Sequence, residues 1–506
     1  MICTVIKGPS FDLIREQIAN SLPIADLVEL RLDCWDVIDK KQLRMLRADF
    51  SIAMILTWRG ASLEDLEALV DLEVVDDWDD ANATKGIGCL TEPEQLLESQ
   101  TVYVDIEFGV SKSWLQAFCL KHPKVKVILS YHDYEKMIPD IDLLYEQMKL
   151  FRADLYKIAV TPQSSIEALK LLELMKRSKG DLIAIGMGKW GECTRILGPV
   201  FGCPITFAAL TDELQSAPGQ LTAQTLIDLY RHRTLNGDTA LYGLIGDPVE
   251  QSIGHITHNH LFQQMQIKAV YVKIPVSISE LQSFLVIAQR VGFKGLSVTM
   301  PLKEAVLSNL DDIDPQARQM GSVNTLVFKN GKILGFNTDG TGALSAIEKK
   351  GSVLNRCVLI IGAGGAARAI AFEAMKRRSR VVILNRDVNR AEMLASALGC
   401  KWGGVDDLLR YYRLGYDFLI QCTPASMPID PQCLYPGAIV MDLTTFPKTT
   451  ALLNEAKLRG CGIVYGYEMF IEQAIGQFNL WFIGFDSWRW KGHLESRALQ
   501  ALADNR

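Results

Sequence analysis

The segment CVLIIGAGGAARAIAFEAM, residues 357–375, constrains the fold more than any other stretch of the chain. An apolar run leads into a glycine-rich turn, and a helix-forming stretch follows directly. A strand, a tight glycine turn and a helix in this order let backbone N–H groups and a helix N-terminus bind a pyrophosphate. The alternative is a turn that only packs the helix on the strand. We expect a nucleotide-binding unit whose turn consists of Gly362, Ala363, Gly364, Gly365 and Ala366.

The next apolar run, RVVILNR (380–386), indicates which dinucleotide is bound. An NAD site typically has an acidic residue at the end of this second strand, where it accepts a ribose hydroxyl. Arg386 stands there instead and favours a 2′-phosphate, hence NADP. Asp387, one position further on, keeps NAD open as the alternative.

Three segments before the glycine turn carry candidate catalytic residues. GLSVTMPLKEAV (295–306) places Lys303 after a strand, and GSVNTLV and GFNTDGTG add Asn324 and Asp339. A lysine and an aspartate that converge on a ketone supply hydride reduction with a proton donor and its charge partner. Taken singly, a solvated lysine and an Asx turn at NTDG are the alternative interpretations.

The first half of the chain shows a different pattern, in which short β-rich apolar runs alternate with longer amphipathic stretches. Eight such runs occur: MICTVIK (1–7), LVELRLD (27–33), IAMILTW (52–58), TVYVDIEF (101–108), VKVILSY (125–131), DLYKIAV (154–160), LIAIGMG (182–188) and PITFAAL (204–210). This alternation predicts a parallel (β/α)8 TIM barrel, whose reactive residues lie where strands end. The polar stretch RHRTLNGDTA (231–240) is typical of a linker.

Polar residues in or just after these runs are the candidates for a barrel site. They are Glu29, Arg31, Arg59, Asp105, Glu107, His132, Lys157, Arg195, Ser216 and Gln220. Lys157 lies inside an apolar strand, where we expect desolvation to lower its pKa and prepare it to attack a carbonyl; a lysine that extends to solvent is the alternative. His132 is a candidate proton carrier or a structural histidine. The three arginines suggest an anionic substrate, or separate surface ion pairs.

Composition narrows the class of protein. The 506 residues are 48% hydrophobic and 22% charged, as in soluble proteins with several cores. The net charge of −6 is spread without a basic stripe for nucleic acid. Eleven cysteines without a C-x-x-C pair, no secretory leader and no apolar run of roughly 18 to 20 residues fit a cytoplasmic protein. We therefore expect small-molecule substrates and neither nucleic acid nor a membrane as a partner.

Five ordered motifs make residues 1–235 resemble type I 3-dehydroquinate dehydratase: ELRLD, SYHDYEKMIP, ADLYKIAVTP, GECTRILG and SAPGQ. The resemblance implies that Lys157 forms a Schiff base with the substrate ketone and that His132 moves protons. It also implies substrate contacts from Glu29, Arg31, Arg59, Arg195, Ser216 and Gln220, and no metal. The family usually has a glutamate four residues after the third-strand arginine to orient the histidine. Here that position is Leu63, and we expect Glu64 or Glu67 to substitute.

Seven ordered motifs make residues 241–485 resemble shikimate dehydrogenase: YGLIGDPVEQSIGHITHN, SVTMPLK, GSVNT, GFNTDG, GAGGAARA, LNRDVNRAE and MFIEQAIGQFNLW. The resemblance implies Lys303 and Asp339 as the catalytic pair. The implied substrate contacts are Ser252, Thr299, Asn324 and Gln473. The implied NADP site comprises the 362–366 turn, Asn385, Arg386, Arg390 and Gly466.

The second half departs from the family pattern at a few positions. The family often has a second serine where Gly254 stands, a proline at His255, a tyrosine at Thr445 and a threonine at Asp387. His255, His258 and His260 lie close in sequence, but no spaced cysteine or acid completes a ligand set, so we expect no metal there.

The combined interpretation is a two-enzyme α/β chain. We expect a dehydratase barrel over 1–235, a substrate-binding domain over 241–340, a Rossmann NADP domain over 341–470 and C-terminal helices (471–506) that return to the substrate domain. The expected reactions convert 3-dehydroquinate to 3-dehydroshikimate and then, with NADPH, to shikimate. The alternatives are an NAD-dependent quinate or shikimate dehydrogenase in the second half, or a sensor of these acids without catalysis.

Overall fold

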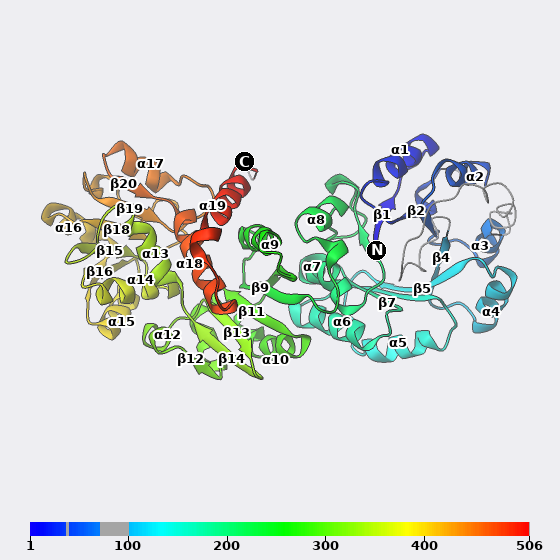
Figure 1. The fold of residues 1–506 in the computed structure, drawn as a ribbon, viewed down its shortest axis with the longest axis horizontal. Helices are drawn as coiled ribbons and strands as arrows, with labels where there is room; N and C mark the ends of the chain where they lie inside the picture. The colour runs from blue at the N-terminus through cyan, green and yellow to red at the C-terminus, as the bar shows by residue number, and fades with distance from the viewer. Residues whose placement is uncertain (37–39, 71–100, 505–506) are drawn as a thin grey trace. The chain divides into compact units, whose positions relative to one another are not determined.

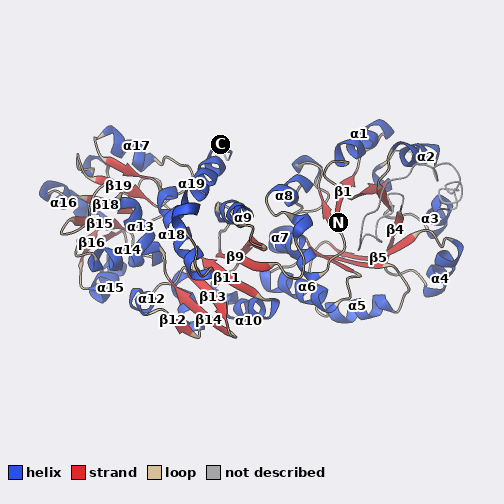
Figure 2. Cartoon of the chain, viewed as in Figure 1, coloured by secondary structure: helices blue, strands red, loops and turns tan. Residues whose placement is uncertain are grey.

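The structure, a computed structural model, describes residues 1–36, 40–70 and 101–504. They belong to two units, Met1–Thr239 and Ala240–Arg506, each of which has its own sheets and covering helices (Figures 1 and 2). Within the described ranges, no helix combines the length and the apolar character that a membrane span needs. Both units are α/β folds, as the sequence predicts.

The first unit is built on eight parallel strands. They are β1 (Ile2–Ile6), β2 (Leu27–Arg31), β3 (Ala53–Thr57), β4 (Val102–Glu107), β5 (Lys126–Asp133), β6 (Leu155–Val160), β7 (Leu182–Gly186) and β8 (Thr206–Ala208). The sheet runs in the order β7-β6-β5-β4-β3-β2-β1-β8, so it is a nearly closed barrel with β7 and β8 as its two ends. Each of the eight predicted apolar runs matches one strand, although β5 continues two residues beyond its run, and the predicted barrel is confirmed.

Helices alternate with these strands and surround the barrel (Figure 2). They are α1 (Phe11–Ser21), α2 (Lys40–Asp49), α3 (Leu63–Val70), α4 (Lys112–Lys121), α5 (Ile141–Lys149), α6 (Ser165–Arg177), α7 (Gly188–Leu197) and α8 (Ala223–Asp228). In α6 the Ser164 side chain accepts a hydrogen bond from the N–H of Glu167 and caps the helix, while Leu169 and Leu172 are buried. Because helices cover the outer face, the strands are apolar along most of their length.

The register of the barrel brings polar residues together in its interior. In the parallel pairing, Glu107 of β4 is the partner of Ser130 of β5, and Ser130 is the partner of Lys157 of β6. Thr57 of β3 likewise pairs with Asp105 of β4. Four neighbouring strands thus contribute polar side chains near one another.

The second unit begins with a mixed sheet. Its strands are β9 (Ala240–Gly246), β10 (Ala269–Pro275), β11 (Phe293–Val298), β12 (Asp312–Ile313), β13 (Thr325–Lys329) and β14 (Lys332–Phe336), in the order β10-β9-β11-β13-β14-β12. The helices of this part are α9 (Gly254–Gln264), α10 (Leu281–Val291), α11 (Leu302–Ala305) and α12 (Pro315–Met320). The antiparallel hairpin of β13 and β14 brings Asn324 and Asp339, which flank it, toward the same end of the sheet.

The second sheet of this unit is parallel and doubly wound. Its strands are β15 (Cys357–Ile361), β16 (Arg380–Asn385), β17 (Lys401–Gly404), β18 (Phe418–Gln421), β19 (Ile439–Asp442) and β20 (Gly462–Val464), in the order β17-β16-β15-β18-β19-β20. The helices are α13 (Asp339–Glu348), α14 (Gly365–Lys376), α15 (Val388–Leu398), α16 (Leu408–Leu414) and α17 (Ala451–Leu458). The strand order reverses beside β15, as in a Rossmann fold, where dinucleotides bind at the carboxyl ends.

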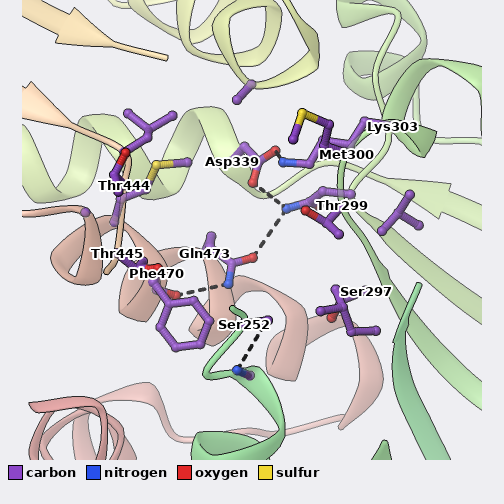
Figure 3. A pocket seen from close by; sticks show the side chains of 18 of the residues that line it. Ser252, Ser297, Thr299, Met300, Lys303, Asp339, Thr444, Thr445, Phe470 and Gln473 are labelled. Atoms are coloured by element: carbon purple, nitrogen blue, oxygen red, sulfur yellow. Dashed lines mark hydrogen bonds and ion pairs between the residues drawn. The ribbon is translucent and has the colours of Figure 1, made fainter. Parts of the chain in front are cut away.

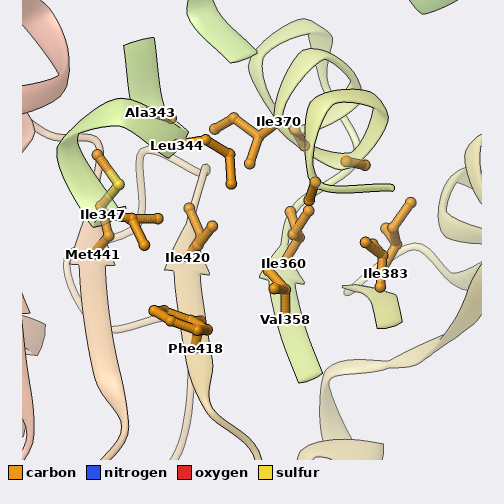
Figure 4. Packing of buried hydrophobic residues seen from close by; sticks show 14 of the residues in the cluster. Ala343, Leu344, Ile347, Val358, Ile360, Ile370, Ile383, Phe418, Ile420 and Met441 are labelled. Atoms are coloured by element: carbon orange, nitrogen blue, oxygen red, sulfur yellow. The ribbon is translucent and has the colours of Figure 1, made fainter. Parts of the chain in front are cut away.

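The core of this sheet packs α13 and α14 against its central strands. Ile347 of α13 and Ile370 of α14 lie over β15 and β18 beside Ile360 and Ile420 (Figure 4). All four side chains are fully buried. This packing fixes the position of the glycine turn, because α14 begins directly at it.

The last two helices, α18 (Gly466–Trp481) and α19 (Ser487–Asp504), pack with the first sheet of the unit and with α9. Trp481 Nε1 donates to the carbonyl oxygen of Leu326 at 3.1 Å, and a side chain at Gly295 would collide with the Trp481 ring. After the last strand of the parallel sheet, the chain thus returns to the mixed sheet β10-β9-β11-β13-β14-β12. The predicted four-part division of the chain stays a prediction.

Candidate active sites

The barrel unit contains a cavity lined from the carboxyl-terminal parts of its strands and the loops that follow them. All eight residues predicted for this site line it: Glu29, Arg31, Arg59, His132, Lys157, Arg195, Ser216 and Gln220. Tyr134 and Phe207 are part of the same lining. The barrel thus brings the predicted nucleophile, proton carrier and substrate contacts to one place.

Lys157 is buried at the centre of this site. Its Nζ lies 3.1 Å from Asp105 Oδ2 and 3.5 Å from Glu29 Oε1, and 4.0 Å from the centre of the Phe207 ring. Burial lowers the pKa of Lys157, but the two carboxylates outweigh burial and raise the pKa above its ordinary value. The expectation of a lowered pKa was therefore wrong, because it counted desolvation without the acidic partners on β2 and β4.

Asp105 is the acid that links Lys157 to the rest of the site. It is 3% exposed, and besides Lys157 it contacts Arg59 Nη2 at 3.0 Å and accepts a hydrogen bond from Ser130 Oγ at 2.5 Å. Burial alone would raise the pKa of Asp105, but the two cations hold it well below its usual range. A carboxylate in this setting stays ionised, and it keeps Lys157 charged in turn.

His132 is held from both ring nitrogens. Nδ1 lies 3.0 Å from Glu107 Oε2, and Nε2 lies 3.2 Å from Arg59 Nη2. Burial lowers the pKa of His132; Glu107 opposes this shift, while Lys157 and Arg59 add to it. The imidazole is consequently neutral near pH 7 and able to accept a proton.

The acid beside His132 is not one of the two that the sequence suggested. Glu67 Oε1 binds Lys121 Nζ at 2.9 Å, and Glu64 is exposed on α3. Among the described residues, the acid in contact with the imidazole is Glu107, so that expectation was wrong. Asp105 and Glu107 had been singled out as polar positions of β4 but not assigned; their spacing of two, which places both on one side of a strand, was the available signal.

Two arginines of the site differ in how they are paired. Arg31 Nη2 binds Asp33 at 2.7 Å, and this bond raises the arginine's pKa further. Arg195 is buried, donates from Nη1 to the carbonyl oxygen of Phe207 at 3.2 Å, and its Nε has no partner among the described residues. Burial lowers the pKa of Arg195 to about 10. A buried guanidinium that forms no ion pair with a carboxylate of the described residues is suited to bind an anionic substrate.

Ser216 and Gln220 form the part of the lining that follows β8. The backbone N–H and the hydroxyl of Ser216 both donate to Gln220 Oε1, at 2.7 and 3.0 Å. Lys7 Nζ, after β1, donates to the carbonyl oxygen of Gln215 at 2.6 Å. These bonds fix the loop at the rim of the cavity.

The second unit contains a cavity of about 350 Å³ between the two sheets' carboxyl ends. The predicted residues that line it are Ser252, Thr299, Lys303, Asn324, Asp339, Ala366, Gly466 and Gln473. Gly362, Ala363, Gly364, Gly365, Asn385, Arg386 and Arg390 lie outside this lining, around β15 and β16. The cavity thus brings the predicted catalytic and substrate residues together, and the turn meets it at Ala366.

Lys303 and Asp339 form a close pair in this cavity. Lys303 Nζ lies 2.5 Å from Asp339 Oδ2 (Figure 3). Asn324 Nδ2 donates to Asp339 Oδ1 at 2.8 Å. Asn324 is itself held, because its Oδ1 accepts the backbone N–H of Thr338 at 2.9 Å. Both carboxylate oxygens are therefore oriented, and the ammonium points along a fixed direction.

Gln473 and Ser252 lie on other sides of the same cavity (Figure 3). Gln473 Nε2 donates to the carbonyl oxygen of Phe470 at 3.1 Å, and its Oε1 lies 3.4 Å from Asn324 Nδ2. Ser252 Oγ accepts the N–H of Gly254 at 3.1 Å, and a Cβ at Gly254 would lie 3.2 Å from that oxygen. A side chain at position 254 would therefore crowd the Ser252 hydroxyl.

A chain of polar side chains in this cavity was not predicted. The Tyr271 hydroxyl donates to Ser297 Oγ at 2.7 Å, and Ser297 Oγ donates to Gln477 Oε1 at 2.9 Å. Gln477 Nε2 in turn donates to the backbone oxygen of Asn324 at 3.2 Å. Ser297 and Gln477 both stand inside motifs that the sequence offered. Gln477 follows Gln473 by four positions, so helical spacing was the available signal.

Two of the three clustered histidines of α9, His258 and His260, have different surroundings. His258 Nδ1 donates to the carbonyl oxygen of Gly254 at 2.8 Å, and the ring stacks on Tyr271 with centres 4.3 Å apart. Burial lowers the pKa of His258 to about 4. The His260 ring faces His493 at 6.4 Å. In the part of the chain that the structure describes, no group of three or more His, Cys, Asp or Glu side chains could hold a metal ion.

The glycine turn after β15 fits a dinucleotide. Gly362 has a φ of 116°, and a Cβ there would lie 2.9 Å from Thr423 Cγ2, so a side chain is excluded by both conformation and space. A Cβ at Gly364 would meet nothing within 4 Å, which leaves the N-terminus of α14 open on that side. The first backbone N–H groups of a helix have no partners within the helix and bind phosphate oxygens.

The end of β16 presents two exposed arginines and one acid that is already engaged. Arg386 and Arg390 are exposed to solvent. Asp387 Oδ1 accepts the N–H groups of Asn389 and Arg390, at 3.1 and 3.4 Å, and caps α15. Asn385 Nδ2 donates to the carbonyl oxygen of Asp387 at 2.9 Å. Asp387, the acid that kept NAD as an alternative cofactor, thus caps the N-terminus of α15.

A barrel with a lysine at its centre, joined in one chain to a Rossmann unit with a lysine–aspartate pair, defines a bifunctional lyase and oxidoreductase. Comparison with known families agrees. The type I 3-dehydroquinase family matches residues 2–236, the shikimate dehydrogenase substrate binding domain matches 244–326, and the shikimate / quinate 5-dehydrogenase family matches 345–433.

Two relatives match this chain over almost its whole length. "Shikimate biosynthesis protein AroDE" of Chlamydia pneumoniae is 36% identical over 489 residues, which cover 96% of each chain. The chloroplastic bifunctional 3-dehydroquinate dehydratase/shikimate dehydrogenase of Arabidopsis thaliana is 33% identical over 95% of this chain and 81% of that protein. A solved shikimate dehydrogenase of Thermus thermophilus, in complex with NADP(H) and shikimate, is 29% identical, covers 52% of this chain and 100% of its own, and has a TM-score of 0.48. The chain belongs to the family of bifunctional 3-dehydroquinate dehydratase/shikimate dehydrogenases of the shikimate pathway.

Proposed function

We propose that this chain dehydrates 3-dehydroquinate through a Schiff base on Lys157 and reduces the product, 3-dehydroshikimate, with NADPH at the Lys303–Asp339 pair. The observation that carries the proposal is the presence of two separate cavities, each with one buried or half-buried lysine beside an acid. All eight barrel residues named for the dehydratase line the first of them. We assign no metal ion to either of the two proposed reactions. We place both steps in the cytoplasm, because the chain has eleven cysteines without a C-x-x-C pair.

In the first step, the unprotonated Lys157 Nζ attacks the ketone and water leaves to form the imine. Asp105 and Glu29 are the carboxylates within reach of the proton that Lys157 must lose. The protonated imine withdraws electrons, so the neighbouring C–H becomes acidic enough for the neutral His132 to remove its proton. Loss of the hydroxyl as water and hydrolysis of the imine complete the dehydration. Arg195 is placed to pair with the substrate carboxylate.

In the second step, the Lys303 ammonium donates a proton to the ketone oxygen as that oxygen gains negative charge. Asp339 holds the ammonium in place, and Asn324 holds Asp339. NADPH supplies the hydride when it is bound. Ser252, Thr299, Asn324 and Gln473 are the proposed contacts of the substrate.

The proposed cofactor is NADP rather than NAD. Arg386 and Arg390 are unburied cations at the carboxyl end of β16, where a 2′-phosphate would lie. Asp387, the acid that could accept a ribose hydroxyl, uses Oδ1 to cap α15. The 362–366 turn, Asn385 and Gly466 complete the proposed cofactor site.

A coupled assay tests the proposal. The protein is incubated with 3-dehydroquinate and NADPH, NADH or no cofactor, while enone absorbance and cofactor oxidation are recorded together. We expect the enone to form without cofactor and to disappear with NADPH, and much more slowly with NADH. Enone formation with no NADPH oxidation would contradict the reductase half, and no enone under any condition would contradict the dehydratase half.

A further inference from the structure

The partner of His132 decides whether the imidazole can take a proton from the substrate. A histidine that acts as a base must expose one ring nitrogen with its lone pair, and a hydrogen bond at the other nitrogen fixes that state. Position 63, where the family usually has a glutamate for this purpose, is Leu63 here. The question of what replaces it rests on the proposed dehydratase function.

Glu107, the last residue of β4, is in direct contact with His132. Its Oε1 accepts the backbone N–H of His132 at 3.1 Å, and its two oxygens lie 3.2 and 3.0 Å from Nδ1. The carboxylate is 46% exposed, while the His132 side chain is 11% exposed. One acid thus grips both the backbone and the ring of the histidine.

Arg59 shows which nitrogen of His132 carries the proton. Its Nη2 lies 3.2 Å from Nε2, and a guanidinium has donors only. Nε2 must therefore be the acceptor, and Nδ1 must carry the hydrogen that it donates to Glu107. The tautomer is the one that a base acting through Nε2 requires.

The position of Glu107 is itself fixed from the barrel interior. Arg59 Nη1 binds Glu107 Oε2 at 2.5 Å, and the same guanidinium contacts Asp105 at 3.0 Å. Ser130 Oγ lies 3.4 Å from Glu107 Oε2 and 2.5 Å from Asp105 Oδ1. The carboxylate cannot turn away from the imidazole without breaking these contacts.

We propose that Glu107 is the positioning residue of His132: its carboxylate keeps the imidazole proton on Nδ1, so that the lone pair that takes up a proton stays on Nε2. It takes the place of the acid missing at Leu63. Its action is through the histidine, and it does not touch the reacting atoms.

The test compares Glu107→Gln, Glu107→Asp and the unaltered full-length protein in the dehydratase assay over a range of pH. The groups that face His132 are Glu107, Asp105, Arg59, Lys157 and the Tyr134 ring. Removal of the Glu107 charge removes a group that raises the pKa of His132. For Glu107→Gln we expect kcat to fall about 10- to 100-fold, KM to change less than about threefold, and the acidic limb of kcat/KM to move to lower pH.

Glu107→Asp keeps the charge, so we expect the acidic limb near its original pH and an intermediate kcat. Glu67→Gln is the matched control, because this acid binds Lys121 and not the histidine, and we expect it to behave as the unaltered protein. If Glu107→Gln does not fold, ¹⁵N spectra of histidine in the unaltered protein decide instead. We expect the neutral His132 ring to carry its proton on Nδ1.

Several results would overturn the proposal. One is a Glu107→Gln variant whose kcat stays within about threefold of the original. Another is a loss that lies wholly in KM, with the acidic limb of the kcat/KM profile unchanged. The third is a His132 ring that carries its proton on Nε2. The KM result would mean that Glu107 only orients Arg59. In all of these cases an active unaltered protein leaves the proposed dehydratase function standing, whereas an inactive one overturns that function and this inference with it.

Discussion

Lys157 shows that the charge state of a buried side chain depends on its partners more than on its depth. Desolvation alone would favour the neutral amine, but Asp105 at 3.1 Å and Glu29 at 3.5 Å reverse the direction and raise the pKa. The lysine is therefore stored as an ammonium and must give up a proton before it attacks the ketone. Proton loss from Lys157 becomes part of the chemistry that pH controls.

Replacement of Asp105 by asparagine tests this control. Asp105 is the stronger of the two carboxylates that raise the pKa of Lys157, so Asp105→Asn should lower that pKa. Borohydride trapping of the imine with 3-dehydroquinate, followed by mass spectrometry of the peptide containing Lys157, measures the unprotonated amine. We expect the trapping rate of Asp105→Asn to rise at lower pH than in the unaltered protein.

Asp142→Asn is the control for this measurement, because Asp142 pairs with Arg177 on the outside of the barrel. Its trapping profile should match that of the unaltered protein. An Asp105→Asn profile displaced to higher pH would mean that the carboxylate does not stabilise the ammonium, and label on another lysine would remove Lys157 as the nucleophile.

For single residues, the sequence predicted which side chains lie in the barrel site better than it predicted their protonation states and partners. Lys157, His132 and Arg195 could be named because each lies in or next to an apolar run, where burial of a polar side chain is costly unless it has partners or a ligand. The sequence could not predict the direction of the Lys157 pKa shift or the contact of His132 with Glu107. Both depend on contacts between β4, β5 and β6. Such contacts join residues that are at least 25 positions apart.

The turn between β15 and α14 is the element on which cofactor binding depends most. Its first glycine, Gly362, has a positive φ of 116°, and a Cβ there would lie 2.9 Å from Thr423 Cγ2. Gly364 has an ordinary φ of −94°, and a Cβ there would meet nothing within 4 Å. Two glycines of one motif thus serve different ends. The first permits the turn, and the second keeps its surface clear for a phosphate.

Gly362→Ala should therefore disturb both stability and cofactor binding. A side chain in this conformation costs on the order of 1–3 kcal/mol, and the Cβ would collide with Thr423. We expect a lower Tm and a KM for NADPH raised at least about tenfold, measured by thermal unfolding and by the reductase assay.

Gly364→Ala separates the two effects. It should raise the KM for NADPH, because a methyl group enters the space meant for phosphate, while Tm stays close to that of the unaltered protein. Equal losses of Tm in both variants would contradict the different roles assigned to the two glycines.

Helices and strands could be predicted where a local sequence pattern indicates them. The eight barrel strands are near-continuous apolar runs because helices cover their outer faces. The glycine spacing at 357–375 predicts the strand, turn and helix there. The path of α18 could not be derived from periodicity. Its place depends on contacts such as Trp481 with Leu326, 155 positions apart, and only the family resemblance implied it.

For the whole molecule, the central point is that two independent chemistries occupy one chain. The barrel unit has its own core around Ile14, Leu30 and Met54, and the second unit has separate cores for its two sheets. Each cavity draws its residues from one unit only. Loss of one lysine should therefore leave the other reaction intact.

The most direct test of this claim measures both activities in Lys157→Ala and in Lys303→Ala, each made in the full-length chain. We expect Lys157→Ala to lose dehydration by at least about 1,000-fold and to reduce added 3-dehydroshikimate with NADPH at a rate within about twofold of the original. Lys303→Ala should show the opposite pattern, with dehydration retained and reduction lowered at least about 100-fold. If either variant lost both activities while remaining folded, the account of two separate lysine-centred sites would be contradicted.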